Sequence, residues 1–271
     1  MSDDKVLYRI EDNIAIITLN RPEQRNAQDL ELILQLDQAW TRAAEDKSIK
    51  VLILNANGPH FSAGHDISQA AMAQAPVDWK GEVIADLYHS ESKHYIELGR
   101  KWRNTPKPSI AAVQGACIAA GMMLVWPCDL IIAADNAKFS DPVVHMGIGG
   151  VEYHGHTWEL GHRKAKEILF MSSSIDAATA LQLGMVNKVV GVAELLDEAL
   201  AMAKVIARKP AFGLAMAKRS VNRTMDIMGF ENAIEQVFDI HELGHGNAQS
   251  FTGQPIIADL DGMKKKLQRG D

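Results

Sequence analysis

Two imidazoles and a carboxylate stand at metal-binding spacing near the end of this 271-residue chain, where residues 241–245 read H-E-L-G-H. On a helix, this spacing puts both imidazoles on one face for zinc and leaves the glutamate as a general base. A catalytic zinc needs a third protein ligand, but only three aspartates, and no glutamate or histidine, follow His245. Little chain remains from which to build a cleft. We therefore predict no metal site, and a half-exposed helix near a subunit contact.

Backbone N–H groups are the second candidate chemistry, because small residues gather at two places. Ala63 and Gly64 follow a predicted buried strand, and residues 119–121 (A-A-G) begin a predicted helix. Small side chains let backbone approach a ligand, and a loop that enters a helix leaves N–H donors free at the positive end of the dipole. Two such donors aimed at one oxygen would stabilise negative charge that develops on it, each by about 3–4 kcal/mol in the transition state. The alternative is that these small residues only permit close helix packing.

Three ordered segments connect these small residues to a known family. The first reads L-N-R-P at residues 19–22, and the second reads F-S-A-G-H-D-I at residues 61–67. The third reads P-S-I-A-A-V-Q-G at residues 108–115 and continues to C-D-L-I-I-A-A at residues 128–134. Together they resemble the crotonase (enoyl-CoA hydratase/isomerase) family, over about residues 5–225.

The resemblance implies an α/β fold, a crotonase-type spiral of ββα units that forms a core over residues 1–205. A helical C-terminal region over residues 206–271 would pack in homotrimers, or in hexamers made of two trimers. The implied function is an acyl-CoA-processing enzyme, a lyase, isomerase or hydrolase, with coenzyme A as part of the substrate and no separate cofactor. Two alternatives are a β-diketone hydrolase that needs no coenzyme A, and a non-catalytic acyl-CoA binder.

The resemblance also implies which residues hold the substrate. The two oxyanion donors would be the backbone N–H groups of His65 and Ala120, where the family usually has glycine at the second position. Arg25, just before Ala27, resembles the basic residue that faces the phosphates of coenzyme A, although a solvated surface charge is the alternative. The rest of the implied substrate-binding set surrounds His65 and comprises Ala63, Gly64, Asp66 and Ile67.

The two acid–base glutamates of the hydratases fall on apolar residues here. By the same alignment, the first position is Met123 and the second is Val143, so both would border the substrate without moving a proton. We therefore expect slow hydration of enoyl thioesters. In the polar segment that follows, Glu152 is the first candidate base, with His145 and Asp141 next. A hydrogen-bonded structural role is the alternative for each of these three residues.

Periodicity predicts the elements that must position these residues. A hairpin over residues 6–10 and 14–19 comes first, and the wholly apolar run at residues 51–54 indicates a strand buried on both faces. Residues 109–113 and 129–133 indicate two more buried strands. Helical spacing predicts helices over residues 29–46, 158–171, 177–183, 193–207, 212–225, 230–247 and 255–267. One or two helices are expected within residues 68–104, and a turn into a buried helix within residues 115–126.

Composition is that of an ordinary globular protein, with 47% hydrophobic and 23% charged residues. The net charge of −6 argues against general binding to nucleic acid or to an anionic membrane, since both favour a basic surface. No stretch reaches 18 apolar residues and the first residues are polar, so we expect no membrane span and a cytoplasmic enzyme. Cys117 and Cys128 lie in apolar surroundings, which indicates buried free thiols.

Overall fold

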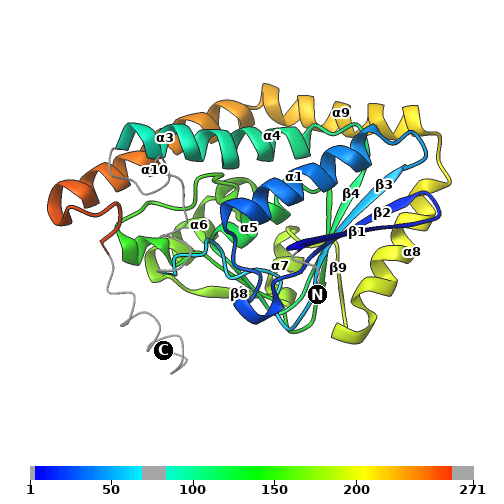
Figure 1. Cartoon of the computed structure of the whole chain (residues 1–271), viewed down its shortest axis with the longest axis horizontal. Helices are drawn as coiled ribbons and strands as arrows, with labels where there is room; N and C mark the ends of the chain where they lie inside the picture. Colours follow the sequence, from blue (N-terminus) through cyan, green and yellow to red (C-terminus); the bar gives the residue numbers. More distant parts are fainter. Residues whose placement is uncertain (1–3, 69–83, 258–271) are drawn as a thin grey trace.

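Six strands form the central sheet of this computed structural model, which describes residues 4–68 and 84–257 (Figure 1). In spatial order the strands are β1 (Val6–Glu11), β2 (Ile14–Leu19), β3 (Val51–Ala56), β4 (Ser109–Val113), β6 (Leu130–Ala134) and β9 (Lys188–Val190). β1 and β2 form the predicted antiparallel hairpin, and every later neighbouring pair is parallel. The three predicted buried strands are confirmed as β3, β4 and β6.

The apolar runs in these strands are explained by cover on both faces of the sheet. Ile53 of β3 belongs to a buried cluster with Ala203 of α8 (Leu195–Ala207). Its neighbour Leu52 belongs to a second cluster, which includes the buried face of α1 (Leu30–Glu45). Successive side chains of a strand point to opposite faces, so a strand covered twice needs apolar residues at every position.

A second, smaller sheet leads into the buried helix α5 (Ala120–Val125). β5 (Ala116–Ile118) pairs in parallel with β7 (Lys138–Ser140), which pairs antiparallel with β8 (Ser174–Asp176). The buried helix predicted within residues 115–126 is therefore confirmed, with one short strand before it. β7, β8 and β9 did not emerge from the sequence, because three residues are too few to display an alternating pattern.

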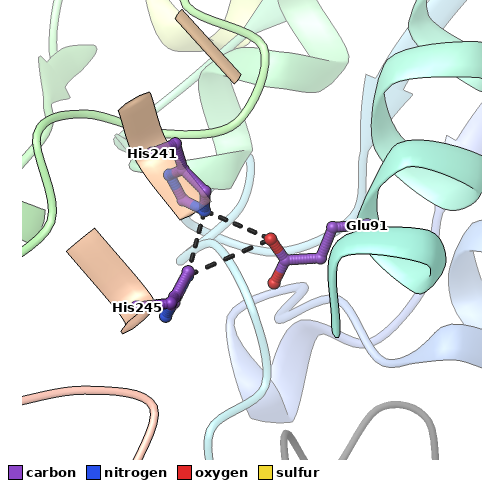
Figure 2. Close-up of side chains that lie close together, drawn as sticks. All are labelled: Glu91, His241 and His245. Atoms are coloured by element: carbon purple, nitrogen blue, oxygen red, sulfur yellow. Dashed lines mark hydrogen bonds and ion pairs between the residues drawn. The ribbon is translucent and has the colours of Figure 1, made fainter. Parts of the chain in front are cut away.

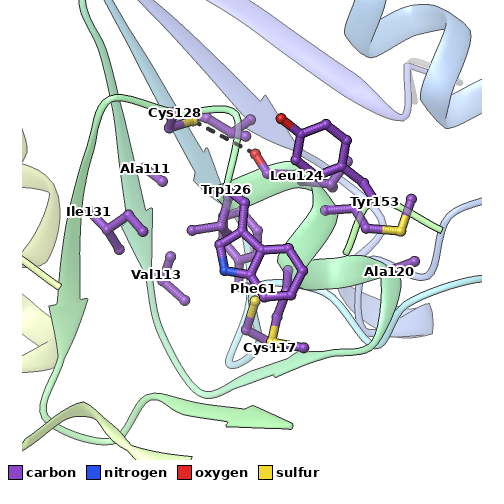
Figure 3. Close-up of a cluster of buried hydrophobic side chains, with 14 of the residues drawn as sticks. Phe61, Ala111, Val113, Cys117, Ala120, Leu124, Trp126, Cys128, Ile131 and Tyr153 are labelled. Carbon is purple, nitrogen blue, oxygen red and sulfur yellow. Dashed lines mark hydrogen bonds between the residues drawn. The ribbon is translucent and has the colours of Figure 1, made fainter. Parts of the chain in front are cut away.

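An apolar cluster surrounds α5 and includes both cysteines (Figure 3). Phe61 and Cys117 are fully buried in it, and both thiols are free and buried, as the sequence predicts. Burial raises the pKa of the Cys117 thiol and brings the pKa of the Cys128 thiol to about 12. Neither group forms a reactive thiolate at neutral pH.

The predicted helices of the second half are confirmed as α6 (His156–Met171), α7 (Ala177–Leu183), α8, α9 (Ala211–Ile227) and α10 (Phe230–Thr252). α6 is interrupted at Gly161, whose φ of 71° and ψ of 154° lie outside the helical range. The helix predicted over residues 255–267 falls mainly outside the described residues. None of the helices in the described ranges combines the length and the apolar character needed to cross a membrane.

A rod of consecutive helical turns lies beside α9 and α10 in Figure 1. It consists of α3 (Ile84–Glu91), a π-helical turn η3 (Ser92–Ile96) and α4 (Glu97–Arg103), and it confirms the helices expected in this stretch.

Ion pairs fasten the rod to the last two helices. Arg103 lies 2.9 Å from Asp226, and Arg100 lies 2.8 Å from Glu231. The predicted division at residue 205 falls in the last turn of α8, and the separation into core and helical region stays a prediction.

Candidate active site

Residues 61–66 run between two backbone neighbours that leave one N–H group free. On one side, the strand β5 exchanges backbone hydrogen bonds with Ser62. On the other side, Gln28 donates to the Gly64 carbonyl and accepts from the Asp66 N–H, each at 2.8 Å. Gln28 thus bonds to the residues before and after His65 and bypasses His65 itself. Within the described part of the chain, the backbone N–H of His65 donates no hydrogen bond.

The second predicted donor lies where β5 turns into α5. Ala119 has φ 49° and ψ −118°, a conformation that is rare for a residue with a side chain. Its own N–H bonds to the Ser140 carbonyl at 2.8 Å, and the helix begins at the next residue. Ala120 is the first helical residue, so its N–H has no carbonyl one turn earlier to bond with. It too has no acceptor among the residues that the structure describes.

Glycines bring the two donor segments into direct backbone contact. A Cβ on Gly64, whose φ is +87°, would lie 2.9 Å from the Ile118 carbonyl oxygen and 3.4 Å from the Ala120 nitrogen. A Cβ on Gly121 would lie 2.8 Å from the Ser62 carbonyl oxygen. Only glycine fits at both positions without displacing backbone. The small residues that stand out in the sequence therefore serve one close approach, at which the two free N–H groups lie on neighbouring segments.

The side chain of His65 pairs with the first candidate base. Its Nε2 lies 2.7 Å from Oε1 of Glu152, and the Glu152 side chain is only 3% exposed while that of His65 is 26% exposed. The ring of Tyr95, from η3, lies against the His65 ring with 4.6 Å between centroids. The Nδ1 of His65 is buried and has no partner among the described residues. One ring nitrogen is thus held by a carboxylate, and the other is left for a further ligand.

The two groups of this pair perturb each other in the expected directions. Burial lowers the pKa of His65, but the Glu152 carboxylate outweighs it, and the net pKa is raised. Burial raises the pKa of Glu152, but His65, and then His241, outweigh it and bring the pKa to about 2. The pair therefore favours a carboxylate beside an imidazolium.

Asp141 lies fully buried, where it joins the two ends of a loop. Its carboxylate accepts from the Val143 N–H at 3.2 Å and from the Val151 N–H at 3.0 Å. The Nε2 of His156, also fully buried, lies 2.9 Å from Oδ2 of Asp141, although that nitrogen lacks the alignment of a hydrogen bond. The distance supports an electrostatic contact more than a directed bond. Asp141 thereby fixes the loop that leads to Glu152, a role that occupies both of its oxygens.

The remaining candidates in this region differ in exposure. His145 is exposed, on the 3-10 turn η4 (Val143–Met146), so the structure does not bring it to the His65–Glu152 pair. Met123 of α5 is 4% exposed and Val143 is 8% exposed, and both belong to the apolar core. Neither offers a group that titrates.

The predicted coenzyme A residues differ in their exposure. Arg25 is exposed and accepts the Ala63 N–H at its carbonyl, at 2.9 Å. Asp66 forms an ion pair with Arg21 at 3.0 Å, which occupies part of its carboxylate. Ile67 is exposed, and Ala27 is buried beside Arg25 in the chain. Exposure of Arg25 leaves its guanidinium available to an anionic ligand.

Sequence reasoning missed Tyr95 and Glu91, which lie in the polar stretch before β4. Among the described residues, Glu91 joins His241 and His245 in a group whose possible ligand atoms all lie within 4.8 Å of one another. The H-E-x-x-H spacing is the signal for the two histidines. No local spacing points to Glu91, because it precedes His241 by 150 residues.

Comparison with known proteins identifies the family. A family model described as enoyl-CoA hydratase/isomerase matches residues 9–249. EchA13 of Mycobacterium tuberculosis, named as a candidate enoyl-CoA hydratase, is 41% identical over 253 residues, which cover 89% of this chain and 80% of the relative. The 1,2-epoxyphenylacetyl-CoA isomerase of Escherichia coli is 32% identical over 221 residues, covering 80% of this chain and 81% of that protein.

Solved structures extend the likeness to three dimensions. The crystal structure of a probable enoyl-CoA hydratase from Mycobacterium thermoresistibile matches with a TM-score of 0.88 and 56% identity, over 93% of this chain and 99% of that one. A second, from Mycobacterium smegmatis, matches with a TM-score of 0.88 and 54% identity, over the same shares of the two chains. The predicted α/β fold with a helical C-terminal region is confirmed.

Proposed function

Because the chain belongs to the enoyl-CoA hydratase/isomerase family, we propose that it processes an acyl-CoA thioester through an enolate. The thioester oxygen would accept hydrogen bonds from the backbone N–H groups of His65 and Ala120. The observation that carries the proposal is that both donors lack a partner among the described residues, on segments that touch through Gly64 and Gly121. Donors fixed before the reaction stabilise developing negative charge without reorganisation.

The proton carrier in this proposal is the His65 side chain, positioned by Glu152. The ring takes up a proton in its neutral form and returns it as an imidazolium, while the carboxylate holds one ring nitrogen. The Nδ1 of His65 is the nitrogen without a partner among the described residues. Glu152 itself is almost fully buried behind the imidazole. We therefore assign the proton transfer to His65 and an orienting role to Glu152, which was the first candidate base from the sequence.

Ordinary hydration of an enoyl thioester does not follow from this site. Hydration needs both an activated water and a proton donor, and the expected acid–base positions carry Met123 and Val143. A single His65–Glu152 pair supports one proton transfer, as in isomerisation or bond cleavage beside a carbonyl. Coenzyme A enters as part of the substrate, its phosphates near Arg25, and enolate formation needs no organic cofactor.

A trimer or a dimer of trimers is part of the proposal. Large apolar side chains are exposed on the last helices: Phe212, Val221, Ile227, Met228, Ile240, Leu243 and Phe251. Monomers rarely expose so many, so this distribution supports self-association. Light scattering coupled to size-exclusion chromatography measures the mass directly, and a monomer at micromolar concentration would contradict it.

The test of the function is enolate formation itself. Saturated and unsaturated acyl-CoA esters, with ring-containing acyl groups among them, are incubated with the protein in deuterated water, and exchange of the α-protons is followed by NMR. We expect exchange that His65→Gln abolishes and that requires the coenzyme A moiety. Cleavage of a cyclic β-diketone without affinity for coenzyme A would instead support the carbon–carbon hydrolase. Tight acyl-CoA binding with neither exchange nor turnover would support a non-catalytic binder.

A further inference from the structure

Three potential metal ligands converge between α3 and α10 (Figure 2). His241 and His245 stand one turn apart on α10, and their Nε2 atoms lie 3.0 Å from each other. Glu91, the last residue of α3, points its carboxylate at both: its Oε2 lies 3.1 Å from Nε2 of His241 and 4.0 Å from Nε2 of His245. The third ligand that the chain after His245 does not supply comes from upstream.

The outer nitrogens of both rings are held by backbone carbonyls. Nδ1 of His241 lies 2.7 Å from the Gly150 oxygen, and Nδ1 of His245 lies 2.6 Å from the Pro255 oxygen. A carbonyl oxygen only accepts, so each Nδ1 must carry the proton. In neutral imidazoles both Nε2 atoms then present lone pairs, and they meet each other and a carboxylate. Three such groups repel one another unless a metal ion or shared protons lie between them.

The spacing of the three atoms suits a first-row transition metal. Sides of 3.0, 3.1 and 4.0 Å define a triangle. Their mean of about 3.4 Å equals the separation of ligand atoms around a tetrahedral ion with bonds of about 2.0–2.1 Å, the lengths of zinc bonds to imidazole nitrogen and carboxylate oxygen. A backbone carbonyl on the second ring nitrogen is also the usual arrangement behind a metal-bound histidine, because it fixes the tautomer.

A second, independent feature points to a cation at this place. Glu242 is 5% exposed, and both of its carboxylate oxygens are buried without a hydrogen bond from the described residues. It lies beside the Glu91 carboxylate. Two buried carboxyl groups side by side cannot both stay charged without a cation, and otherwise one of them takes up a proton.

We propose that Glu91, His241 and His245 bind one divalent transition-metal ion, with zinc as the first candidate. Two imidazoles and a carboxylate are a known donor set for zinc, and Glu242 is the nearest group that could complete the coordination or hold a metal-bound water. The proposal replaces the sequence prediction of no metal, which rested on the search for a third ligand after His245. It does not depend on the thioester chemistry.

The ion would fasten the loop that carries Glu152. His241 bonds to the Gly150 carbonyl two residues before Glu152, and Glu91 belongs to the helical rod that also supplies Tyr95. Bound metal would therefore join α3, α10 and this loop, and would position the His65–Glu152 pair without contact to the substrate.

The test uses full-length protein without a histidine tag. Metal is removed by a chelator and then returned as zinc, and the bound ion is counted by plasma mass spectrometry after gel filtration. We expect about one zinc per chain, because three ligands define a single site. Glu91→Gln, His241→Gln and His245→Gln should each reduce bound zinc to near zero. His162→Gln, an exposed histidine on α6, is the matched control and should keep it.

A cobalt-loaded sample keeps the proposal testable if a variant fails to fold. Circular dichroism identifies such a variant, and the wild type alone then decides. Its cobalt complex should show ligand-field absorption, and crystals should show anomalous scattering between Glu91 and the two histidines. Fewer than half an equivalent of zinc and no ligand-field band would overturn the proposal. The three side chains would then be joined by shared protons and not by a metal ion. Equal loss in the His162→Gln control, or scattering at another place, would overturn it as well.

Discussion

His65 and Glu152 lie 87 residues apart in the chain, and their side chains meet at 2.7 Å. The backbone of His65 supplies a free N–H to the candidate oxyanion site, while its imidazole is held from behind by the buried carboxylate. One residue thus carries both the candidate oxyanion donor and the candidate proton carrier. Removal of Glu152 should affect the second role and leave the first.

Glu152→Gln should lower the pKa of the His65 imidazole below its wild-type value. Burial lowers that pKa, and the Glu152 carboxylate is the largest group that raises it. A neutral amide cannot balance the imidazolium, so the burial effect should dominate. Histidine ring resonances followed by NMR across a pH titration measure the shift, and the His65→Gln spectrum assigns the peak. An unchanged pKa would show that the contact contributes nothing to the charge of His65.

Gly121→Ala should reduce both turnover and stability. The new Cβ would meet the Ser62 carbonyl oxygen at 2.8 Å, which forces apart the segments that carry the two N–H donors. Overpacking of this kind costs about 1–3 kcal/mol. A displacement near 1 Å costs about 100-fold in rate. Steady-state kinetics and urea unfolding measure the two effects.

The matched control for this variant is Gly213→Ala. Gly213 lies in α9, and an added Cβ there meets nothing within 4 Å. Alanine should stabilise that helix by about 1 kcal/mol and leave turnover unchanged. Wild-type turnover in Gly121→Ala would contradict the assignment of the donors.

Ala119→Gly should stabilise the protein. Ala119 has φ 49° and ψ −118°, where only glycine is free of steric conflict. Relief of that conflict should exceed the entropic cost of glycine and yield about 1 kcal/mol of unfolding free energy. Ala217→Gly, at an exposed position inside α9, should have the opposite sign and a similar size. Urea unfolding of both variants decides, and destabilisation by both would show that the Ala119 conformation costs little.

The backbone part of the site could be predicted from sequence, because its residue types are dictated locally. Gly64 and Gly121 lie where two backbones touch, and both belong to the small-residue segments that stand out in the sequence. The pairing of His65 with Glu152 could not be predicted, since it depends on how a loop held by Asp141 folds back. The path of that loop is a tertiary property, and no spacing in the sequence encodes it.

The different surroundings of the three polar candidates could not be predicted, for the same reason. Asp141, His145 and Glu152 lie within twelve residues and look equivalent as letters. In the structure, Asp141 is fully buried, His145 is exposed and Glu152 pairs with His65. The three residues differ in burial and in partners, and both depend on the whole fold.

The Asp141→Asn variant should be less stable than the wild type, but its folded molecules should keep their activity. The carboxylate accepts from the Val143 and Val151 N–H groups, and an amide offers only one oxygen in place of two. One buried donor would lose its partner, so the expected cost is about 3 kcal/mol. Thermal unfolding and kinetics at low temperature separate stability from rate. Asp176→Asn is the control, because asparagine caps a helix as well as aspartate does and should cost less than about 0.5 kcal/mol. Complete loss of turnover in folded Asp141→Asn would identify a catalytic role.

The His65–Glu152 pair should stabilise the fold most strongly between its two ordinary pKa values. Glu152 has a lowered pKa of about 2 against an ordinary 4.5, so its contribution is present above pH 4.5 and is lost as the pH falls towards 2. His65 has a raised pKa, so its contribution is complete below its ordinary 6.5 and is lost as the pH rises through the raised value.

Urea unfolding of the wild type and of the His65→Gln/Glu152→Gln variant measures that contribution at each pH. The stability difference between the two proteins should be largest between pH 4.5 and 6.5 and should shrink in both directions. Groups far from the pair titrate alike in both proteins and so cancel in the difference, whereas His241, which interacts electrostatically with Glu152, does not. A stability difference that does not change with pH would mean that the pair acts as a neutral hydrogen bond. In that case the Glu152 carboxylate would not favour the protonated form of the His65 ring, and the ring would hold no extra proton for the substrate.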